Sequence, residues 1–278
     1  RRYVALVLTA ITASLGVALP AVVGAPAAPT AATRPVRTAG GLIEEAPDKP
    51  AVKVGRNGAP DRGFMRMHER YVQQAKNDDI DLYLLGDSIT DFWEHAHKAD
   101  WDKNFAGWKA ADFGISGDRT QHVLWRLQNG ELDTVKPKVI VLLIGTNNLP
   151  SNATYAPNTV DDTFKGVKAI VDLLREKEPQ AHILLIAVFP REDDAARGLA
   201  PGTLDAKVKD LNGKIATLTD DDHVKFLNIN DQLTDKNGKL IPDLMRSDHL
   251  HPQDKGYDVW ANAMKPILTG WLGPRSSK

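Results

Sequence analysis

Apolar residues along the chain fall into short continuous runs, separated by longer stretches in which they recur every three or four positions. The short runs predict β-strands at residues 80–85, 111–113, 139–144, 183–189 and 224–229. Unbroken apolar runs of this length are typical of strands buried on both faces of a parallel sheet. The run at 139–144, Val-Ile-Val-Leu-Leu-Ile, is the clearest of them.

The stretches between these runs have the spacing of amphipathic helices. They predict helices around residues 64–75, 123–127, 167–174, 204–218 and 259–268, and we interpret their apolar stripes as facing the core. Strands that alternate with helices predict an open α/β sheet with helices on both sides. Such sheets bind ligands beyond the carboxyl ends of their strands, so the residues that follow each strand are the first to inspect.

The beginning of the chain has a different pattern. Arg1 and Arg2 precede an apolar run at 3–23 and a small-residue site that ends at Ala27, as in an export signal. We therefore expect a signal at residues 1–27, a secreted, periplasmic or cell-envelope location, and no stable membrane insertion after cleavage. A retained membrane anchor is the alternative, because about 20 apolar residues can span a bilayer.

The remaining domain organisation follows from composition. Residues 28–60 are rich in Ala, Pro, Thr and Gly and have no apolar periodicity, which predicts a flexible linker. One folded domain is expected at 61–273, followed by a short tail at 274–278. A chain of 278 residues can bury enough core to fold without covalent staples.

Charge and composition exclude several classes of function. The chain has 35 Lys and Arg against 36 Asp and Glu, so no net positive field favours nucleic acid as a partner. The absence of cysteine excludes disulfide scaffolds, thiolate metal sites and a cysteine nucleophile. His95, His97 and the stretch 220–223 lack the spacing of known zinc sites, so we interpret them as solvated segments and expect neither metal nor cofactor.

The strand ends carry the residue types of serine-based acyl transfer. Ser88 follows the first predicted strand in Gly86-Asp87-Ser88, and Asp248 lies three residues before His251 near the C-terminus. A serine hydroxyl needs a neighbouring base to take its proton, and a histidine oriented by a carboxylate is such a base. His251 is favoured over His249, because His249 directly follows Asp248 and neighbours in extended chain point apart.

A tetrahedral intermediate also needs hydrogen-bond donors for its oxyanion. The backbone amides of Ser88 and Gly117 and the side-chain amide of Asn147 are the candidates, each at the end of a predicted strand. One such donor is worth ~3–4 kcal/mol of the barrier. Glycine at position 117 allows close backbone approach. Arg191, after the fourth predicted strand, is a further candidate substrate contact.

Taken together, Gly86-Asp87-Ser88, Gly117, Gly145-Thr146-Asn147 and the pair Asp248 and His251 resemble the GDSL/SGNH family of esterases and lipases. Residues 112–148 most resemble the catalytic subunits of the intracellular platelet-activating-factor acetylhydrolases and their bacterial relatives. The motifs that carry this likeness are Phe-Gly-Ile-Ser-Gly-Asp-Arg-Thr at 113–120 and His-Val-Leu-Trp-Arg-Leu at 122–127. Ser116 stands where that subgroup commonly has glycine, which is expected to alter the pocket rim.

The resemblance implies a flavodoxin-like three-layer α/β/α sandwich with a central parallel five-stranded sheet. It also implies a catalytic triad of Ser88, His251 and Asp248, an oxyanion hole of Ser88, Gly117 and Asn147, and no metal. The expected activity is hydrolysis of short-chain O-acyl groups, acetyl above all, on a small-molecule or polysaccharide ester or on lipid.

Two other functions are compatible with parts of this pattern, and one other enzyme class is not. A lysophospholipase- or thioesterase-type lipid acylhydrolase stays open as a related enzyme. A non-catalytic sugar-binding surface module would have the fold without the chemistry, and the intact set of site residues argues against it. An α/β-hydrolase is rejected, because Ser88 is not followed by x-Gly and Asp248 lies too close to His251 in the sequence.

Overall fold

The computed structural model describes residues 36–220 and 222–276. Its centre is a five-stranded sheet in the order β4-β3-β5-β6-β7, and every neighbouring pair of strands is parallel. The strands are β3 (Leu82–Gly86), β4 (Ala110–Gly114), β5 (Val139–Leu143), β6 (His182–Ile186) and β7 (Val224–Leu227). All five predicted strands are confirmed, with ends that shift by a few residues.

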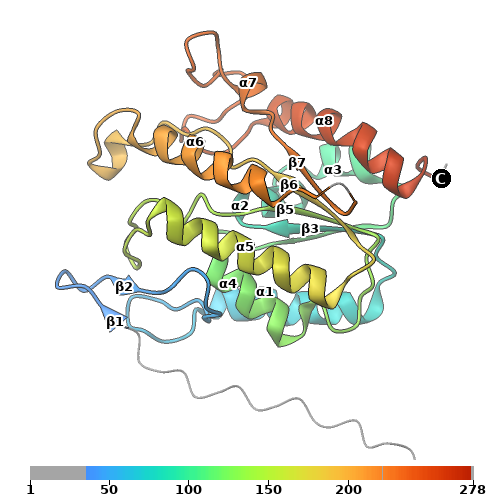
Figure 1. Ribbon diagram of the computed structural model, residues 1–278, viewed down its shortest axis with the longest axis horizontal. Helices are drawn as coiled ribbons and strands as arrows, with labels where there is room; N and C mark the ends of the chain where they lie inside the picture. The colour runs from blue at the N-terminus through green and yellow to red at the C-terminus, as the bar shows by residue number, and fades with distance from the viewer. Residues whose placement is uncertain (1–35, 221, 277–278) are drawn as a thin grey trace, which may run out of the picture. The chain divides into compact units, whose positions relative to one another are not determined.

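Helices cover both faces of this sheet (Figure 1). The helices α1, α4, α5 and α6 contribute to one core cluster, and α2, α3 and α8 to the other. Their bounds are α1 (Arg62–Asn77), α2 (Ser88–His95), α3 (Lys98–Phe105), α4 (Thr120–Arg126), α5 (Val160–Lys177), α6 (Thr203–Ile215), α7 (Asn230–Leu233) and α8 (Asp254–Leu272). The three layers and the strand order are those of the flavodoxin-like fold that the resemblance implied.

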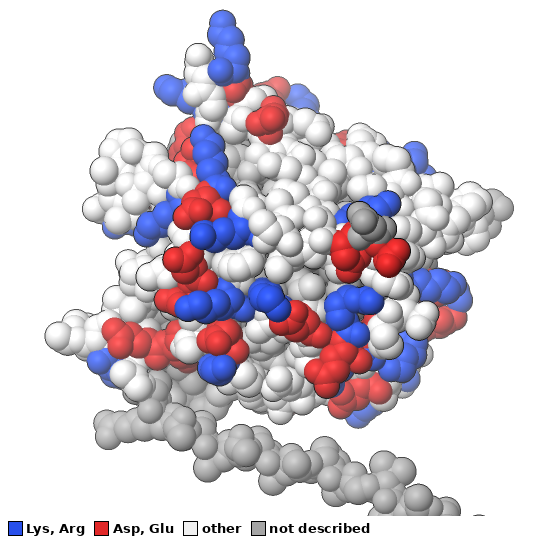
Figure 2. Space-filling model, in the orientation of Figure 1, with Lys and Arg blue, Asp and Glu red and all other residues white. Residues whose placement is uncertain are grey.

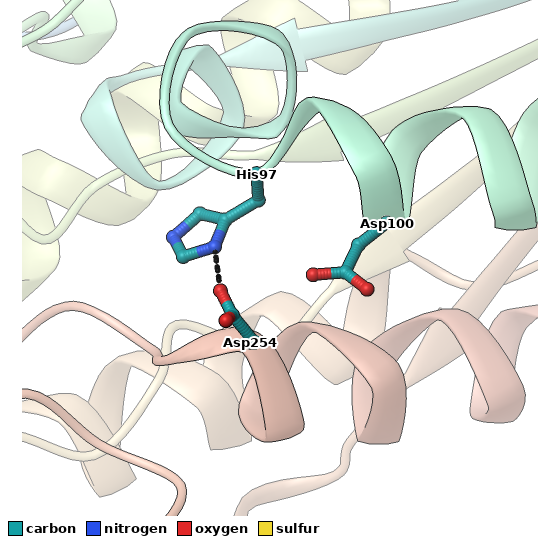
Figure 3. A group of neighbouring side chains, drawn as sticks. All are labelled: His97, Asp100 and Asp254. Carbon is teal, nitrogen blue, oxygen red and sulfur yellow. Dashed lines mark hydrogen bonds and ion pairs between the residues drawn. The ribbon is translucent and has the colours of Figure 1, made fainter.

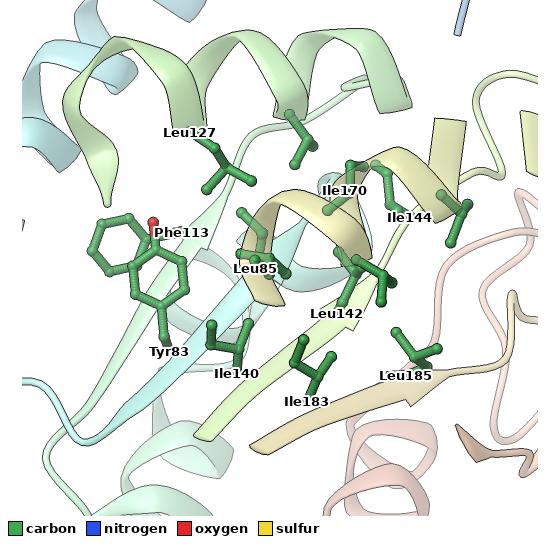
Figure 4. Packing of buried hydrophobic residues seen from close by; sticks show 14 of the residues in the cluster. Tyr83, Leu85, Phe113, Leu127, Ile140, Leu142, Ile144, Ile170, Ile183 and Leu185 are labelled. Carbon is green, nitrogen blue, oxygen red and sulfur yellow. The ribbon is translucent and has the colours of Figure 1, made fainter. Parts of the chain in front are cut away.

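Successive side chains along each strand point to opposite faces of the sheet, so each strand contributes to both core clusters. Tyr83 and Leu85 pack with the first cluster, where the ring of Tyr83 stacks on Phe113 at 3.8 Å between centroids (Figure 4). Leu82 and Leu84 pack with the second cluster. All four side chains in β3 are fully buried. This explains why the strand is a continuous apolar run rather than an alternating one.

The chain before Asp61 differs from the expected linker. Residues 36–60, here called the N-terminal arm, contain a short antiparallel pair, β1 (Val36–Arg37) and β2 (Ile43–Glu44). Ile43 is fully buried, and its backbone exchanges hydrogen bonds with Thr154 O at 2.8 Å and with the Ala156 amide at 2.9 Å. The linker prediction is therefore wrong for the arm, because isolated apolar anchors leave no periodic pattern in the sequence.

Two further predictions concern the two ends of the chain. The predicted export signal at 1–27 lies outside the described residues. In the predicted tail, Arg275 donates a hydrogen bond to Lys103 O at 2.6 Å, which ties it to the end of α3.

The surface carries charges of both signs. On the face drawn in Figure 2, the side chains of Lys and Arg are interspersed with those of Asp and Glu. Among the residues that the structure describes, no helix combines the length and the apolarity that a membrane span requires.

Candidate active site

Ser88 lies where a strand turns directly into a helix. β3 ends at Gly86, and Asp87 caps α2 by accepting a hydrogen bond from the Ile89 amide at 3.0 Å. A Cβ at position 86 would lie 2.2 Å from the Thr90 hydroxyl oxygen, so the turn requires glycine. Ser88 is thereby presented as the first residue of α2, with 7% of its surface exposed.

The structure brings Ser88 together with the predicted histidine and aspartate. Ser88 Oγ lies 2.8 Å from His251 Nε2, and His251 Nδ1 lies 2.8 Å from Asp248 Oδ2. Asp248 Oδ1 accepts hydrogen bonds from the backbone amides of Leu250 at 3.1 Å and His251 at 3.0 Å, which closes a tight turn. His249 is not in this chain of hydrogen bonds, and its φ of 57° is the left-handed conformation.

The hydrogen bonds to Asp248 fix its charge. Partial burial works to raise the pKa of its carboxyl, but the amide and imidazole N–H groups of His251 and the Leu250 amide outweigh it and lower the pKa. An ionised carboxylate can only accept hydrogen bonds, so Nδ1 of His251 carries the proton. The lone pair of Nε2 is then directed at the Ser88 hydroxyl.

The loops that follow the three central strands lie side by side. Gly86 pairs with Gly114 at the end of β4 and with Leu143 at the end of β5. The loop after β4 contains Gly117, whose φ of +77° is the left-handed region that favours glycine. The predicted location of Gly117 at the carboxyl edge of the sheet is thus observed.

Asn147, in the loop after β5, bridges the residues next to Ser88 and Gly117. Its Nδ2 donates to Asp118 O at 3.0 Å and to Asp87 Oδ2 at 3.3 Å. Both N–H groups of this amide therefore face protein acceptors, and the longer hydrogen bond is the one to Asp87.

Asp87 has an environment that the sequence did not reveal. It is fully buried, and desolvation raises the pKa of its carboxyl to about 7, against the opposing effect of the Ile89 amide and with a further increase from the charge of Asp118. The Gly-Asp-Ser motif marks the position of Asp87, but nothing in the motif indicates its burial.

A buried chain of ionisable side chains begins at Asp118, next to Gly117. Asp118 Oδ2 lies 2.9 Å from Arg126 Nε, Arg126 Nη1 lies 2.5 Å from Glu131 Oε2, and Glu131 Oε1 lies 2.9 Å from His68 Nδ1. Lys53 of the N-terminal arm adds its ammonium group 3.4 Å from Asp118 Oδ1. Sequence reasoning missed this chain, and Lys53 fell within the segment expected to be a linker.

Arg191 is not placed to touch a substrate. It is fully buried, with Nε 2.7 Å from Asp193 Oδ1 and Nη1 donating to the carbonyl and hydroxyl oxygens of Thr146. The expectation of a substrate contact is therefore corrected, because the guanidinium fixes the loop that carries Asn147.

A group of potential cation ligands lies between α3 and α8. His97, Asp100 and Asp254 each place one ligand atom within 4.8 Å of the others (Figure 3). His97 Nδ1 donates to the Asp254 carboxylate, and its ring packs 4.2 Å from that of Tyr257. The prediction of a solvated segment is thus wrong for His97. The hydrogen bond ties one helix to the other.

A known family and several known proteins are similar to this chain in sequence or fold. The family model for the GDSL-like lipase/acylhydrolase family matches residues 84–259. The human platelet-activating factor acetylhydrolase IB subunit alpha1 is 32% identical over 209 residues, which cover 75% of this chain and 84% of the relative. The alpha2 subunit from Bos taurus is 36% identical over 181 residues, which cover 65% and 70%.

A solved structure extends the comparison to the fold. The crystal structure of a GDSL-like lipase from Bacteroides thetaiotaomicron has a TM-score of 0.62 and 23% sequence identity, and the match covers 74% of this chain and 97% of that one. The fold and these matches define an enzyme that hydrolyses esters. The chain belongs to the GDSL-like lipase/acylhydrolase family.

Proposed function

We propose that this enzyme hydrolyses short-chain O-acyl esters, acetyl esters above all, through an acyl-enzyme formed on Ser88. The observation that carries the proposal is the continuous hydrogen-bonded chain from Ser88 Oγ through the His251 imidazole to the Asp248 carboxylate. Each member has the partner that its role requires: a hydroxyl facing a base, and a base facing an ionised acceptor.

The first half-reaction follows from this arrangement. Ser88 Oγ attacks the ester carbonyl carbon while its proton passes to His251 Nε2, and the carbonyl oxygen becomes an oxyanion. When the tetrahedral intermediate collapses, the bond to the alcohol oxygen breaks and the imidazolium gives its proton to that oxygen. Water then repeats the sequence on the acyl-enzyme, releasing the carboxylic acid and restoring the Ser88 hydroxyl.

The oxyanion is assigned to the backbone amides of Ser88 and Gly117 and to the Asn147 amide. Asn147 must free one N–H group to serve, and the bond it makes to Asp87 at 3.3 Å is the weaker of its two. The bond to Asp118 O at 3.0 Å is retained and keeps the side chain in place. Burial raises the pKa of Asp87 to about 7, so near neutral pH its carboxyl is only partly ionised and is a weaker acceptor than the fully charged oxyanion.

The acyl group is proposed to be short by analogy with the curated relatives, which are named acetylhydrolases. The alcohol is proposed to be a carbohydrate or a lipid. Among p-nitrophenyl esters, we expect kcat/KM to be highest for acetate and to fall for butyrate and octanoate. A maximum at octanoate would instead favour the lipid acylhydrolase alternative. Acetylated xylan and an acetylated phospholipid would then identify the alcohol.

The role of Ser88 is tested by Ser88→Ala with p-nitrophenyl acetate. We expect kcat/KM to fall at least ~10³-fold, because the nucleophile is lost while the fold is kept. Ser151→Ala, at a serine outside the hydrogen-bonded chain, is the matched control and should retain wild-type turnover. Turnover by Ser88→Ala equal to that of the control would refute the acyl-enzyme on Ser88. A wild-type protein with no turnover above the uncatalysed rate would instead favour a non-catalytic module.

A further inference from the structure

We propose that Lys53 is a positioning residue that orients and polarises the Gly117 amide during ester hydrolysis, an inference that rests on the function proposed above. Lys53 lies in the N-terminal arm, outside residues 84–259 that match the family model. Its Nζ donates to the carbonyl oxygen of Ser116 at 2.6 Å and lies 3.4 Å from Asp118 Oδ1.

The chemistry of one peptide group makes this contact consequential. The carbonyl of Ser116 and the N–H of Gly117 belong to the same planar peptide unit, in which C=O and N–H point in opposite directions when the bond is trans. A group that holds the Ser116 oxygen therefore fixes the direction of the Gly117 N–H. Because the holding group is a cation, it also draws electron density toward the oxygen and makes the N–H a stronger donor.

The side chain of Lys53 is held where it can orient and polarise the Gly117 N–H. It is 16% exposed, and a Cβ built on Gly117 would lie 3.1 Å from its Nζ. The ammonium group therefore rests against residue 117 itself. Its charge is balanced by Asp118, whose other oxygen is bound by Arg126.

The backbone on either side of Lys53 is fixed to the domain. Lys53 O accepts a hydrogen bond from the Asp61 amide at 2.8 Å, and the Val54 amide donates to the Tyr155 hydroxyl at 2.8 Å. The Ala51 amide donates to Gln121 O at 3.1 Å. The stem of Lys53 thus starts from a fixed point, which lowers the entropy cost of holding its ammonium group in one place.

The effect should appear in the transition state. Negative charge on the carbonyl oxygen develops only as Ser88 attacks, so a better oriented Gly117 N–H stabilises the transition state more than the bound ester. Loss of Lys53 should therefore lower kcat and leave KM nearly unchanged. The loss should be smaller than the ~10²–10³-fold that follows removal of an oxyanion donor outright, because the Gly117 amide remains.

The test compares Lys53→Met, which keeps an unbranched stem, with Lys53→Arg, which keeps the charge. With p-nitrophenyl acetate we expect Lys53→Met to lower kcat ~10-fold with KM within ~2-fold of wild type, and Lys53→Arg to recover most of kcat. Lys49→Met is the matched control, since Lys49 is an exposed lysine of the same arm and pairs with Asp48. It should show wild-type kcat.

Folding and chemistry are separated by counting active sites. Titration with a p-nitrophenyl phosphonate reports the concentration of competent Ser88, so kcat per titrated site is unaffected by a misfolded fraction. A Lys53→Met enzyme with wild-type kcat per site, or with a change confined to KM, would overturn the inference. If Ser88→Ala were active, the proposed function would fail. If Ser88→Ala were inactive but Lys53→Met kept full kcat, the proposed function would stand and the inference about Lys53 alone would fail.

Discussion

Asp87 is a carboxyl group that connects the helix cap beneath Ser88 to the amide of Asn147. Its two oxygens accept from the Ile89 amide at 3.0 Å and from Asn147 Nδ2 at 3.3 Å. These two bonds do not compensate for complete burial, so the carboxyl keeps its proton to higher pH than an exposed aspartate. A group whose native pKa is raised makes folding stability depend on pH.

The direction in which Asp87 makes folding stability depend on pH can be measured with Asp87→Asn. Between pH 4 and pH 7 native Asp87 retains a proton that the unfolded chain releases, because folding raises its pKa from 3.8 to about 7. The contribution of Asp87 to the free energy of unfolding therefore falls as pH rises through this window and levels off above it. With asparagine at position 87, the native state no longer binds this extra proton. The slope of the free energy of unfolding against pH should therefore change by up to about 1.4 kcal/mol per pH unit.

Urea unfolding at several pH values gives this slope directly. Comparing slopes is more informative than comparing stabilities, because the amide introduced at position 87 would face the Asn147 N–H groups and destabilise the native state at every pH. Identical slopes for wild type and Asp87→Asn between pH 4 and pH 7 would show that Asp87 ionises normally.

At the scale of elements, the position of Ser88 depends on how closely β4 approaches α2. A Cβ at Gly114, the last residue of β4, would lie 2.1 Å from the Asp91 amide nitrogen and 2.8 Å from Asp87 O. These atoms are backbone of α2 and its cap, so they cannot rotate away. The glycine lets the helix that begins at Ser88 pack directly on the strand.

Gly114→Ala should therefore displace α2 and lower both activity and stability. We expect a fall in kcat of at least ~10-fold and a destabilisation of about 1–3 kcal/mol, the usual cost of overpacking. Gly213→Ala is the matched control in α6, where a Cβ would meet no atom within 4 Å. It should stabilise the enzyme by about 0.4–1 kcal/mol through the unfolded chain. Equal effects of the two alanines, measured by thermal unfolding, would contradict this account.

The elements that the sequence predicted are those whose burial leaves a pattern. The strand at Val139–Leu143 is buried on both faces, and such strands are continuous apolar runs. The short helix at Lys98–Phe105 was not predicted, because only Trp101 and Phe105 of its side chains are buried. The pair β1 and β2 spans two residues in each strand, which is too short for any periodicity.

Some residues of the candidate site could likewise be predicted from the sequence, and others could not. Ser88, Asp248 and His251 could be predicted because together they have the residue types of acyl transfer: Ser88 follows a predicted strand, and the pair Asp248 and His251 precedes the last predicted helix. Lys53 could not, because its role arises from a contact 63 residues away in sequence, with the carbonyl of Ser116. A backbone carbonyl exists at every residue, so such a contact leaves no trace in the residue types.

At the scale of the whole domain, the N-terminal arm closes over the loop between β5 and α5. Ile43, Val54 and Tyr155 form a small hydrophobic cluster of their own, separate from the two clusters that flank the sheet. The Tyr155 hydroxyl also joins the arm to the loop, since it donates to Val54 O at 3.2 Å. A satellite cluster of this kind either unfolds with the domain or opens by itself.

We expect the arm to unfold together with the domain, and Ile43→Ala tests this. Removing a fully buried isoleucine should cost about 2–5 kcal/mol and shift a single urea transition to lower concentration with an unchanged slope m. Val36→Ala is the control in the same arm: Val36 is 65% exposed, so its loss should change stability by less than about 0.5 kcal/mol.

Local opening of the N-terminal arm would give a different result. If the arm opened locally, Ile43→Ala would leave the main transition in place, and limited proteolysis would cut within residues 36–60 while the rest of the domain stayed folded. Because Lys53 lies in the arm, such opening would also lower kcat in proportion to the population of open molecules. A single shifted transition with wild-type kcat under native conditions would establish that the arm, the loop that carries Gly117 and the sheet form one cooperative unit.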